Sequence, residues 1–245
     1  MTTAPVLVAC SHGTRDPAGR ATIHALLEGI ARARPDLDVR EAFVDVQEPE
    51  VADVVAQAQR ELRPEPGAAS GAGAGGDEAT EVVVVPLLLS AGFHVHVDIA
   101  AAVQDVRAVA TGPLGPDPRL AEILADRLAE AGATDDDAVV LAAAGSSDAR
   151  AAADVEQVVA RLQAGRRGPV SIGYGSASHP RVPVAVAAAR EAGARRVVVA
   201  SYLLAPGYFH DRLAEAGADL VTAPLGPDPR LVQIAVDRYE AALRS

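Results

Sequence analysis

An eight-residue segment occurs twice in this chain, and it restricts the possible folds more than any other feature of the sequence. The segment Pro-Leu-Gly-Pro-Asp-Pro-Arg-Leu stands at 113–120 and again, unchanged, at 224–231. Working backward from this match, residues 200–207 align with residues 85–92. Short repeat periods indicate stacked solenoid units, but this period is a whole small domain. We therefore predict two similar halves that arose by duplication, with the Asp-Pro-Arg of each segment starting a helix.

Each half has the pattern of an α/β fold. The valine- and leucine-rich run that begins at Glu81 is typical of a strand buried on both faces of a parallel sheet. Such runs alternate with amphipathic segments, of which the first extends from Pro17 to about Arg34. We expect two three-layer α/β/α halves with central parallel sheets and a cleft between them. The halves comprise residues 1–134 and 135–245, and the Gly/Ala-rich stretch 64–80 is expected to be a flexible loop.

Composition excludes several classes of partner. The formal net charge of -11 argues against nucleic acid or an anionic membrane, although a local group of arginines could still bind a small anion. The longest apolar runs fall short of the roughly 18 residues that a membrane-spanning helix needs. Cys10 is the single cysteine, so no internal disulfide can form, which fits a reducing compartment. We expect a cytoplasmic protein.

Three titratable residues stand at the ends of three predicted strands. His12 follows the first strand, Asp45 the second and His94 the third. If these strands are parallel neighbours, the side chains converge at one edge of the sheet, where α/β proteins bind ligands. Two imidazoles and a carboxylate suit a divalent first-row metal with open coordination positions. The alternative is that each is a hydrogen-bonded loop residue, but three of them at corresponding strand ends favour a site.

The second half has lost these groups. The alignment places Ala144, Ser176 and Phe209 opposite His12, Asp45 and His94. This asymmetry predicts one active site, built mainly by the first half and covered by the second. His179 and His210 remain in the second half at shifted positions, where a cleft-lining role and a purely structural role are equally compatible with the sequence.

Further residues near these strand ends could contact a ligand. Arg15 lies near a predicted helix N-terminus and is a natural anion contact, to which free backbone amides of Gly13 and Thr14 would add. Its alternative is a solvated surface arginine. His96 could share a metal, line a substrate path or start the next helix, and we favour the substrate path.

Three motifs together resemble one family, the sirohydrochlorin chelatases, which are small ATP-independent (class II) tetrapyrrole chelatases. The motifs are Ser-His-Gly-Thr-Arg-Asp-Pro at 11–17, Ala-Phe-Val-Asp-Val-Gln-Glu-Pro at 42–49 and Gly-Phe-His-Val-His-Val-Asp-Ile at 92–99. The resemblance covers the whole chain, because the family includes two-half members with a degenerate second half. It implies insertion of Co²⁺ or Fe²⁺ into sirohydrochlorin, for cobalamin or sirohaem, with the metal as a substrate and no nucleotide.

The resemblance also implies roles for individual residues. His12 and His94 are expected to bind the metal and act in catalysis, and one of them, with Asp45 nearby, to accept a pyrrole proton. Asp45 stands where many relatives carry Glu, and it is one methylene shorter. The residues expected to contact the anionic macrocycle are Ser11, Gly13, Thr14, Arg15, Ser90, Gly92, Phe93 and His96.

Two other classes of function remain open at this point. The Ser-His-Gly-Thr segment at 11–14 is faintly similar to the start of histidine phosphatases, which require Arg where Ser11 stands. A non-catalytic metal or tetrapyrrole scaffold is the second alternative. Since two halves in one chain could replace a dimer of single halves, we expect a monomer.

Overall fold

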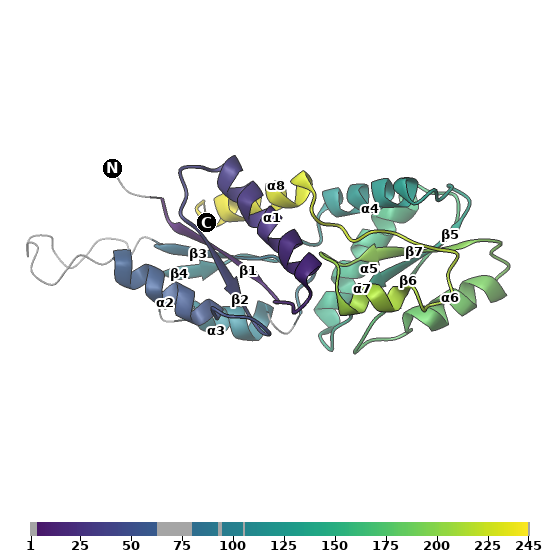
Figure 1. The fold of residues 1–245 in the computed structure, drawn as a ribbon, viewed down its shortest axis with the longest axis horizontal. Coiled ribbons are helices and arrows are strands. Elements are labelled where there is room, and N and C mark those ends of the chain that lie inside the picture. The colour runs from purple at the N-terminus through teal and green to yellow at the C-terminus, as the bar shows by residue number, and fades with distance from the viewer. Residues whose placement is uncertain (1–3, 63–79, 93–94, 105, 245) are drawn as a thin grey trace, which may run out of the picture.

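The computed structural model describes residues 4–62, 80–92, 95–104 and 106–244, which form two α/β lobes (Figure 1). The predicted loop at 64–80, apart from residue 80, and the predicted site residues Phe93 and His94 lie outside the described residues. The elements from the first half are β1 (Val6–Ser11), α1 (Pro17–Ala33), β2 (Val39–Phe43), α2 (Val51–Leu62), β3 (Val82–Pro86), a π-helical turn η1 (Val95–Ile99), α3 (Ala100–Ala102), β4 (Ala108–Ala110) and α4 (Pro118–Glu130). Those from the second half are β5 (Ala138–Ala143), α5 (Ala149–Ala164), β6 (Val170–Tyr174), α6 (Val182–Glu191), β7 (Val197–Tyr202), α7 (Tyr208–Leu213), β8 (Leu220–Val221) and α8 (Pro229–Ala242).

The two sheets have the same topology, which confirms the predicted α/β fold. Their strand orders are β2-β1-β3-β4 and β6-β5-β7-β8, and every described strand pair is parallel. In the first sheet β1 lies between β2 and β3, so the ends of these three strands are neighbours, as the site hypothesis requires. No helix within the described ranges is long and apolar enough to cross a membrane.

Helix starts follow the predicted signals. The carboxylate of Asp16 accepts a hydrogen bond from Gly19 N (2.8 Å) and caps α1, with Pro17 in the first turn. The repeated aspartates Asp117 and Asp228 cap α4 and α8 in the same way, by accepting from the backbone N–H two residues later (3.0 and 2.9 Å). The expectation that the repeated segments start helices is confirmed.

The sequence pattern also predicts a second helix that starts at Glu48-Pro49, a third strand that extends to Ser90 and a helix at 97–105, and the structure differs at these three boundaries. The second helix begins at Val51, two residues after the expected Glu48-Pro49 start. The third strand ends at Pro86 rather than near Ser90, because the chain beyond it turns toward the second lobe, where the Tyr202 hydroxyl donates to Leu89 O (2.9 Å). The helix expected at 97–105 is shorter, consisting of the π-helical turn η1 and the single turn α3.

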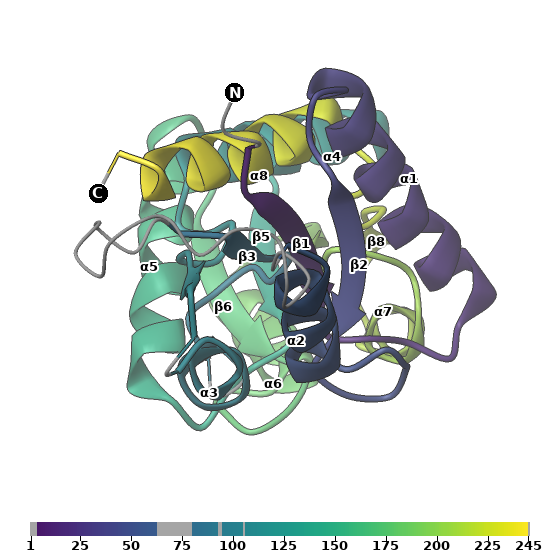
Figure 2. The ribbon, with the colours of Figure 1, turned by 90° about the vertical axis from the view of Figure 1, so that its left-hand side faces the viewer.

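The last helix of each sequence half packs on the lobe formed mainly by the other half. Helix α8 packs against α1 and β3 of the first lobe, and α4 packs against α5 and β7 of the second. Figure 1 shows α8 beside α1 over the first sheet and α4 over the second. In Figure 2, α2 and α3 lie on the opposite side of the first sheet from α8. The division at 134/135 stays a prediction about the sequence repeat, because the spatial lobes exchange these two helices.

One apolar core therefore spans both lobes. Alternate residues of β1 face opposite sides, so that Leu7 and Ala9 join a core that continues through α4 and α8 to Leu141 of β5. Val8 and Cys10 face a separate core under α2. Since the larger core includes side chains from both sheets, we expect the lobes to unfold together.

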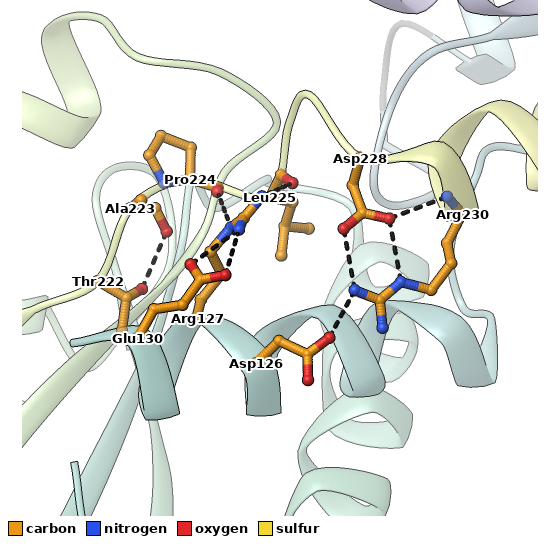
Figure 3. Close-up of polar contacts among 9 residues, drawn as sticks. All are labelled: Asp126, Arg127, Glu130, Thr222, Ala223, Pro224, Leu225, Asp228 and Arg230. Carbon is orange, nitrogen blue, oxygen red and sulfur yellow. Dashed lines mark hydrogen bonds and ion pairs between the residues drawn. The ribbon is translucent and has the colours of Figure 1, made fainter. Parts of the chain in front are cut away.

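The two crossing segments that lead into α4 and α8 are the repeated octapeptides, and each is held by an arginine. Arg127 of α4 donates from Nε to Pro224 O (3.0 Å) and from Nη2 to Leu225 O (3.1 Å) (Figure 3). Arg238 of α8 makes the matching pair of bonds, to Pro113 O (3.0 Å) and Leu114 O (3.3 Å). The repeated segment thus forms a nearly symmetric connection between the lobes.

Ion pairs reinforce this connection. Arg230, at the start of α8, contacts both Asp228 (2.9 Å) and Asp126 of α4 (2.6 Å) (Figure 3). Burial alone would raise the pKa of Asp228, but hydrogen bonds from the side chain and backbone of Arg230 outweigh it, and the pKa lies below its usual range. Arg119 pairs with Asp117 (2.9 Å) and with Asp237 of α8 (2.7 Å) in the same arrangement.

Candidate functional site

A cavity of about 750 Å³ lies between the two lobes. The first lobe lines it with residues 11–15 after β1, with Val46 and with residues 87–90 and 92 after β3. The second lobe lines it with residues 143–147 after β5, with the first turns of α5 and with residues 202–210. The cavity is therefore at the carboxyl ends of parallel strands in both sheets, where α/β folds place their ligands.

The turn that carries His12 is fixed by the loop after β2. Asp45 N donates to His12 O (3.1 Å), and Thr14 N donates to Gln47 Oε1 (2.7 Å). Gly13 has a φ of +91°, and a Cβ at this position would collide with Asp45 O, so only glycine fits. The imidazole of His12 is exposed and lines the cavity.

This turn corrects one expectation. The backbone amide of Thr14 is not free for an anion, because the Gln47 side chain already accepts its hydrogen bond. Arg15 is exposed at the cavity. Ser11 is 2% exposed and lines the cavity, and its Oγ has no hydrogen-bond partner among the described residues. Because a buried hydroxyl without a partner is costly, Ser11 Oγ is a polar group that a ligand could satisfy.

Asp45 is not brought into the cavity. Its side chain is exposed and accepts a hydrogen bond from Val46 N (2.7 Å), and it is not among the described residues that line the cavity. Val46 itself does line the cavity, 43% exposed and with a φ of +65° that β-branched residues rarely adopt. No sequence pattern marks Val46 as a cavity residue, apart from its position next to Asp45.

The loop after β3 is held by the second lobe. Ala91 N donates to Asp154 Oδ2 of α5 (2.8 Å), and the Tyr202 hydroxyl donates to Leu89 O (2.9 Å). Burial raises the pKa of Tyr202, so this hydroxyl keeps its proton and remains a donor. Sequence reasoning missed both Asp154 and Tyr202, because each acts across the lobes on a backbone atom.

Ser90 and Gly92 of this loop line the cavity, as predicted for substrate contacts. Phe93 and His94 follow at once but lie outside the described residues, and their positions stay predictions. The backbone of His96 belongs to η1, while its side chain also lies outside the description. Among the described side chains, no three of the metal-ligating types gather closely enough to hold an ion.

One of the two histidines in the second lobe lines the cavity. His210 lines the cavity, and its Nε2 lies 3.1 Å from Thr222 O. His179 is exposed and is not among the described lining residues. Gly145, with a φ of +92°, repeats the geometry of Gly13, so the two copies of the turn share a backbone conformation although Ala144 stands where the first copy has His12.

The charge of the cavity differs from that of the protein. The chain has 33 acidic residues, yet none of them is among the described residues that line the cavity. Arg15 is the charged side chain in this described lining; the rest is mostly apolar, with His12, His210 and several hydroxyl groups. Such a surface suits a ligand that is large, mainly apolar and negatively charged at its edge.

This chain is similar to known proteins in sequence. The family model CbiX matches residues 6–131 and 138–242. A sirohydrochlorin ferrochelatase of Priestia megaterium is 29% identical over 154 residues, covering 59% of this chain and 58% of the relative. A sirohydrochlorin cobaltochelatase of the same organism is 27% identical over 221 residues, covering 83% of this chain and 65% of the relative. The chain thus spans about three fifths of the length of these two relatives.

Two solved structures share the fold. SirB from Bacillus subtilis with Fe³⁺ superposes with a TM-score of 0.77 at 20% sequence identity, over 98% of this chain and 96% of that chain. The sirohydrochlorin chelatase SirB from Bacillus subtilis subspecies spizizenii in complex with cobalt gives a TM-score of 0.75 at 19% identity, over the same shares. At these identities the likeness establishes the two-lobed fold.

Proposed function

Because the chain belongs to the CbiX family of sirohydrochlorin chelatases, we propose that it inserts a divalent metal ion into sirohydrochlorin without a nucleotide. The observation that carries the proposal is the cavity between the lobes, which combines a mostly apolar lining with Arg15 and two histidines and has no described acidic residue. A tetrapyrrole has the same character, since its macrocycle is apolar and its peripheral carboxylates are anionic.

The carboxylates would be held by the turn after β1. Arg15 is exposed at the cavity and can form a charge-assisted pair with a carboxylate. The buried Ser11 Oγ can donate a hydrogen bond to the same ligand. Gly13, Thr14, Ser90 and Gly92 contribute to the walls of the cavity, and we propose Phe93 and His96 as further contacts.

Metal delivery and proton removal are assigned to the histidines. Insertion requires two pyrrole N–H protons to leave as metal–nitrogen bonds form. We assign His12 and His94 to the ion, since neutral imidazole both binds metals and accepts protons near neutral pH. We assign Asp45 to positioning the turn that carries His12. Its backbone N–H donates a hydrogen bond to His12 O, and its carboxylate accepts one from Val46 N.

Both metals remain candidates within this proposal. The printed activities of the two Priestia megaterium relatives are ferrochelatase and cobaltochelatase, and the two Bacillus subtilis structures hold Fe³⁺ and cobalt. The product would accordingly serve sirohaem or cobalamin synthesis. One chain supplies both walls of the cavity, so we propose a monomer.

The test is an absorbance time course of sirohydrochlorin with Co²⁺ and, separately, with anaerobic Fe²⁺. The native protein should accelerate insertion above the spontaneous rate, while His12→Ala and His94→Ala should abolish the acceleration. His24→Ala is the matched control, because His24 is exposed on α1 and pairs with Glu28 away from the cavity (3.3 Å). Binding of the pigment without acceleration would replace the chelatase by a tetrapyrrole-binding scaffold, and absence of both would refute the proposal.

A further inference from the structure

Two aromatic side chains are exposed, whereas the other aromatic side chains that the structure describes are buried. The chain has four Tyr, three Phe and no Trp. The described aromatics Phe43, Tyr174, Tyr202 and Tyr239 are all buried. Tyr208 and Phe209, at the start of α7, are 69% and 40% exposed, and both line the cavity between the lobes. Because exposing large apolar groups forgoes the stabilisation of burial, an adjacent exposed pair at a cavity indicates a contact surface.

The pair has a defined geometry. The ring centroids of Tyr208 and Phe209 are 5.6 Å apart with an interplanar angle of 71°, the edge-to-face arrangement that aromatic quadrupoles favour. Phe209 also packs against Gly175, where an added Cβ would lie 3.0 Å from the Phe209 ring. The two rings are therefore held at a defined angle to one another.

The segment before the pair is packed against the first lobe. A Cβ on Gly19 of α1 would lie 2.7 Å from Pro206 O, and a Cβ on Gly207 would lie 3.7 Å from Thr14 Oγ1. Gly207 is buried and has a φ of +145°, a backbone conformation that residues with a side chain rarely adopt, so this position favours glycine. These contacts anchor the start of α7 beside the turn that carries His12 and Arg15.

The duplication adds a comparison within the chain. Residues 200–207 align with 85–92, so Tyr208 and Phe209 correspond to Phe93 and His94. The second copy therefore has an aromatic ring where the first copy has the histidine assigned to the metal. One copy of the segment kept an ion-binding group, and the other kept only ring surface at the cavity.

We propose that Tyr208 and Phe209 form a stacking surface for the flat, conjugated macrocycle, and that the second lobe thereby binds and orients the pigment while the first lobe handles the metal. This inference rests on the proposed function and adds a binding surface to it. Contacts between aromatic rings need only a π face on each partner. A conjugated tetrapyrrole offers such a face on both sides.

The test separates pigment binding from metal insertion. Metal-free sirohydrochlorin is titrated with native protein and with Tyr208→Ala, Phe209→Ala and the double variant, by absorbance and fluorescence of the pigment. We expect the dissociation constant to rise roughly three- to tenfold in each single variant and more in the double variant. At saturating pigment the insertion rate should fall much less than the affinity, giving a KM effect rather than a kcat effect.

Matched variants test whether a change in pigment affinity comes from loss of the aromatic ring. Tyr208→Phe keeps the ring and should bind as the native protein does. Phe209→Leu keeps the apolar packing on Gly175 but removes the ring, so it should lose affinity without losing stability. Val184→Ala changes a 58% exposed apolar residue on α6, outside the described lining, and should have no effect.

Failure of this inference differs from failure of the proposed function. Native insertion activity with unchanged pigment affinity in the double variant would overturn the stacking surface and leave the chelatase proposal standing. Weakened binding in the ring-removing variants, in a protein that never accelerates insertion, would support the stacking surface and overturn the chelatase proposal. A native protein that binds no pigment would overturn both.

Discussion

Removal of Arg127 tests how the crossing segments join the lobes. The guanidinium donates to the carbonyls of Pro224 and Leu225, at 3.0 and 3.1 Å, and its side chain is only 16% exposed. Hydrogen bonds from a charged donor contribute about 1.5–3 kcal/mol each. Water entering the vacated space will satisfy part of this loss, so Arg127→Ala should lower the free energy of unfolding by about 2–3 kcal/mol.

The internal symmetry supplies a replicate of this experiment. Arg238→Ala removes the corresponding bonds to Pro113 and Leu114 and should cost a similar amount. Arg127→Lys keeps the charge but cannot donate to both carbonyls at once. It should therefore lower the free energy of unfolding by about half as much as Arg127→Ala does. Arg32→Ala is the control, because its pair with Glu28 is 71% and 53% exposed and contributes at most about 0.5 kcal/mol.

The measurement is equilibrium unfolding in urea followed by far-UV circular dichroism. We expect a single transition for every variant, because one apolar core spans both lobes. If Arg127→Ala and Arg238→Ala lose no more stability than Arg32→Ala, water replaces the arginines without cost and the reasoning is refuted. Two separate transitions in the native protein would refute the shared core.

Three further predictions address single positions. Gly13→Ala should abolish insertion and lower stability by about 2 kcal/mol or more, because its φ of +91° and its contact with Asp45 O leave no room for Cβ; native-like activity and melting temperature would contradict this. Tyr202→Phe leaves Leu89 O without its buried donor and should cost about 1 kcal/mol in urea unfolding, whereas an unchanged midpoint would show that the bond is replaced. Burial, together with the nearby Asp98 charge, raises the pKa of Cys10 to about 12. The native thiol should therefore resist a thiol reagent at pH 8 and react only after denaturation. Since the unfolded thiol loses its proton near pH 9, the contribution of Cys10 to stability should decline as pH rises from about 9 to 12, and rapid labelling of native protein would refute its burial.

The sequence was sufficient for the architecture because several of its signals are local. Alternating apolar runs and the Asp-Pro helix starts at Asp16, Asp117 and Asp228 each depend on a few neighbouring residues, and the structure confirms them. Because the octapeptide is repeated exactly, the elements predicted for one half could also be predicted for the other. The order that places β1 between β2 and β3 was a condition of the site hypothesis, and the structure meets this condition.

Contacts between the lobes were not predictable in this way. Asp154 and Tyr202 act on backbone atoms of a loop that is distant in sequence, and no pattern marks a side chain that binds a carbonyl or an amide. The same holds for Thr14, whose amide was expected to be free and is held by Gln47. The exposed pair Tyr208 and Phe209 was recognisable only once the burial of the other described aromatic residues was known.

The exchange of α4 and α8 also has a consequence for how the protein forms during translation. Helix α8 covers the α1 side of the first sheet, but it follows the whole of the second lobe in the sequence. While the chain is being synthesised, α1 is therefore present on this face without α8, and the apolar side chains of β3 that α8 contacts stay uncovered. The larger apolar core, which includes side chains of β1, β3 and α8, is therefore complete only after the end of the second copy has been synthesised.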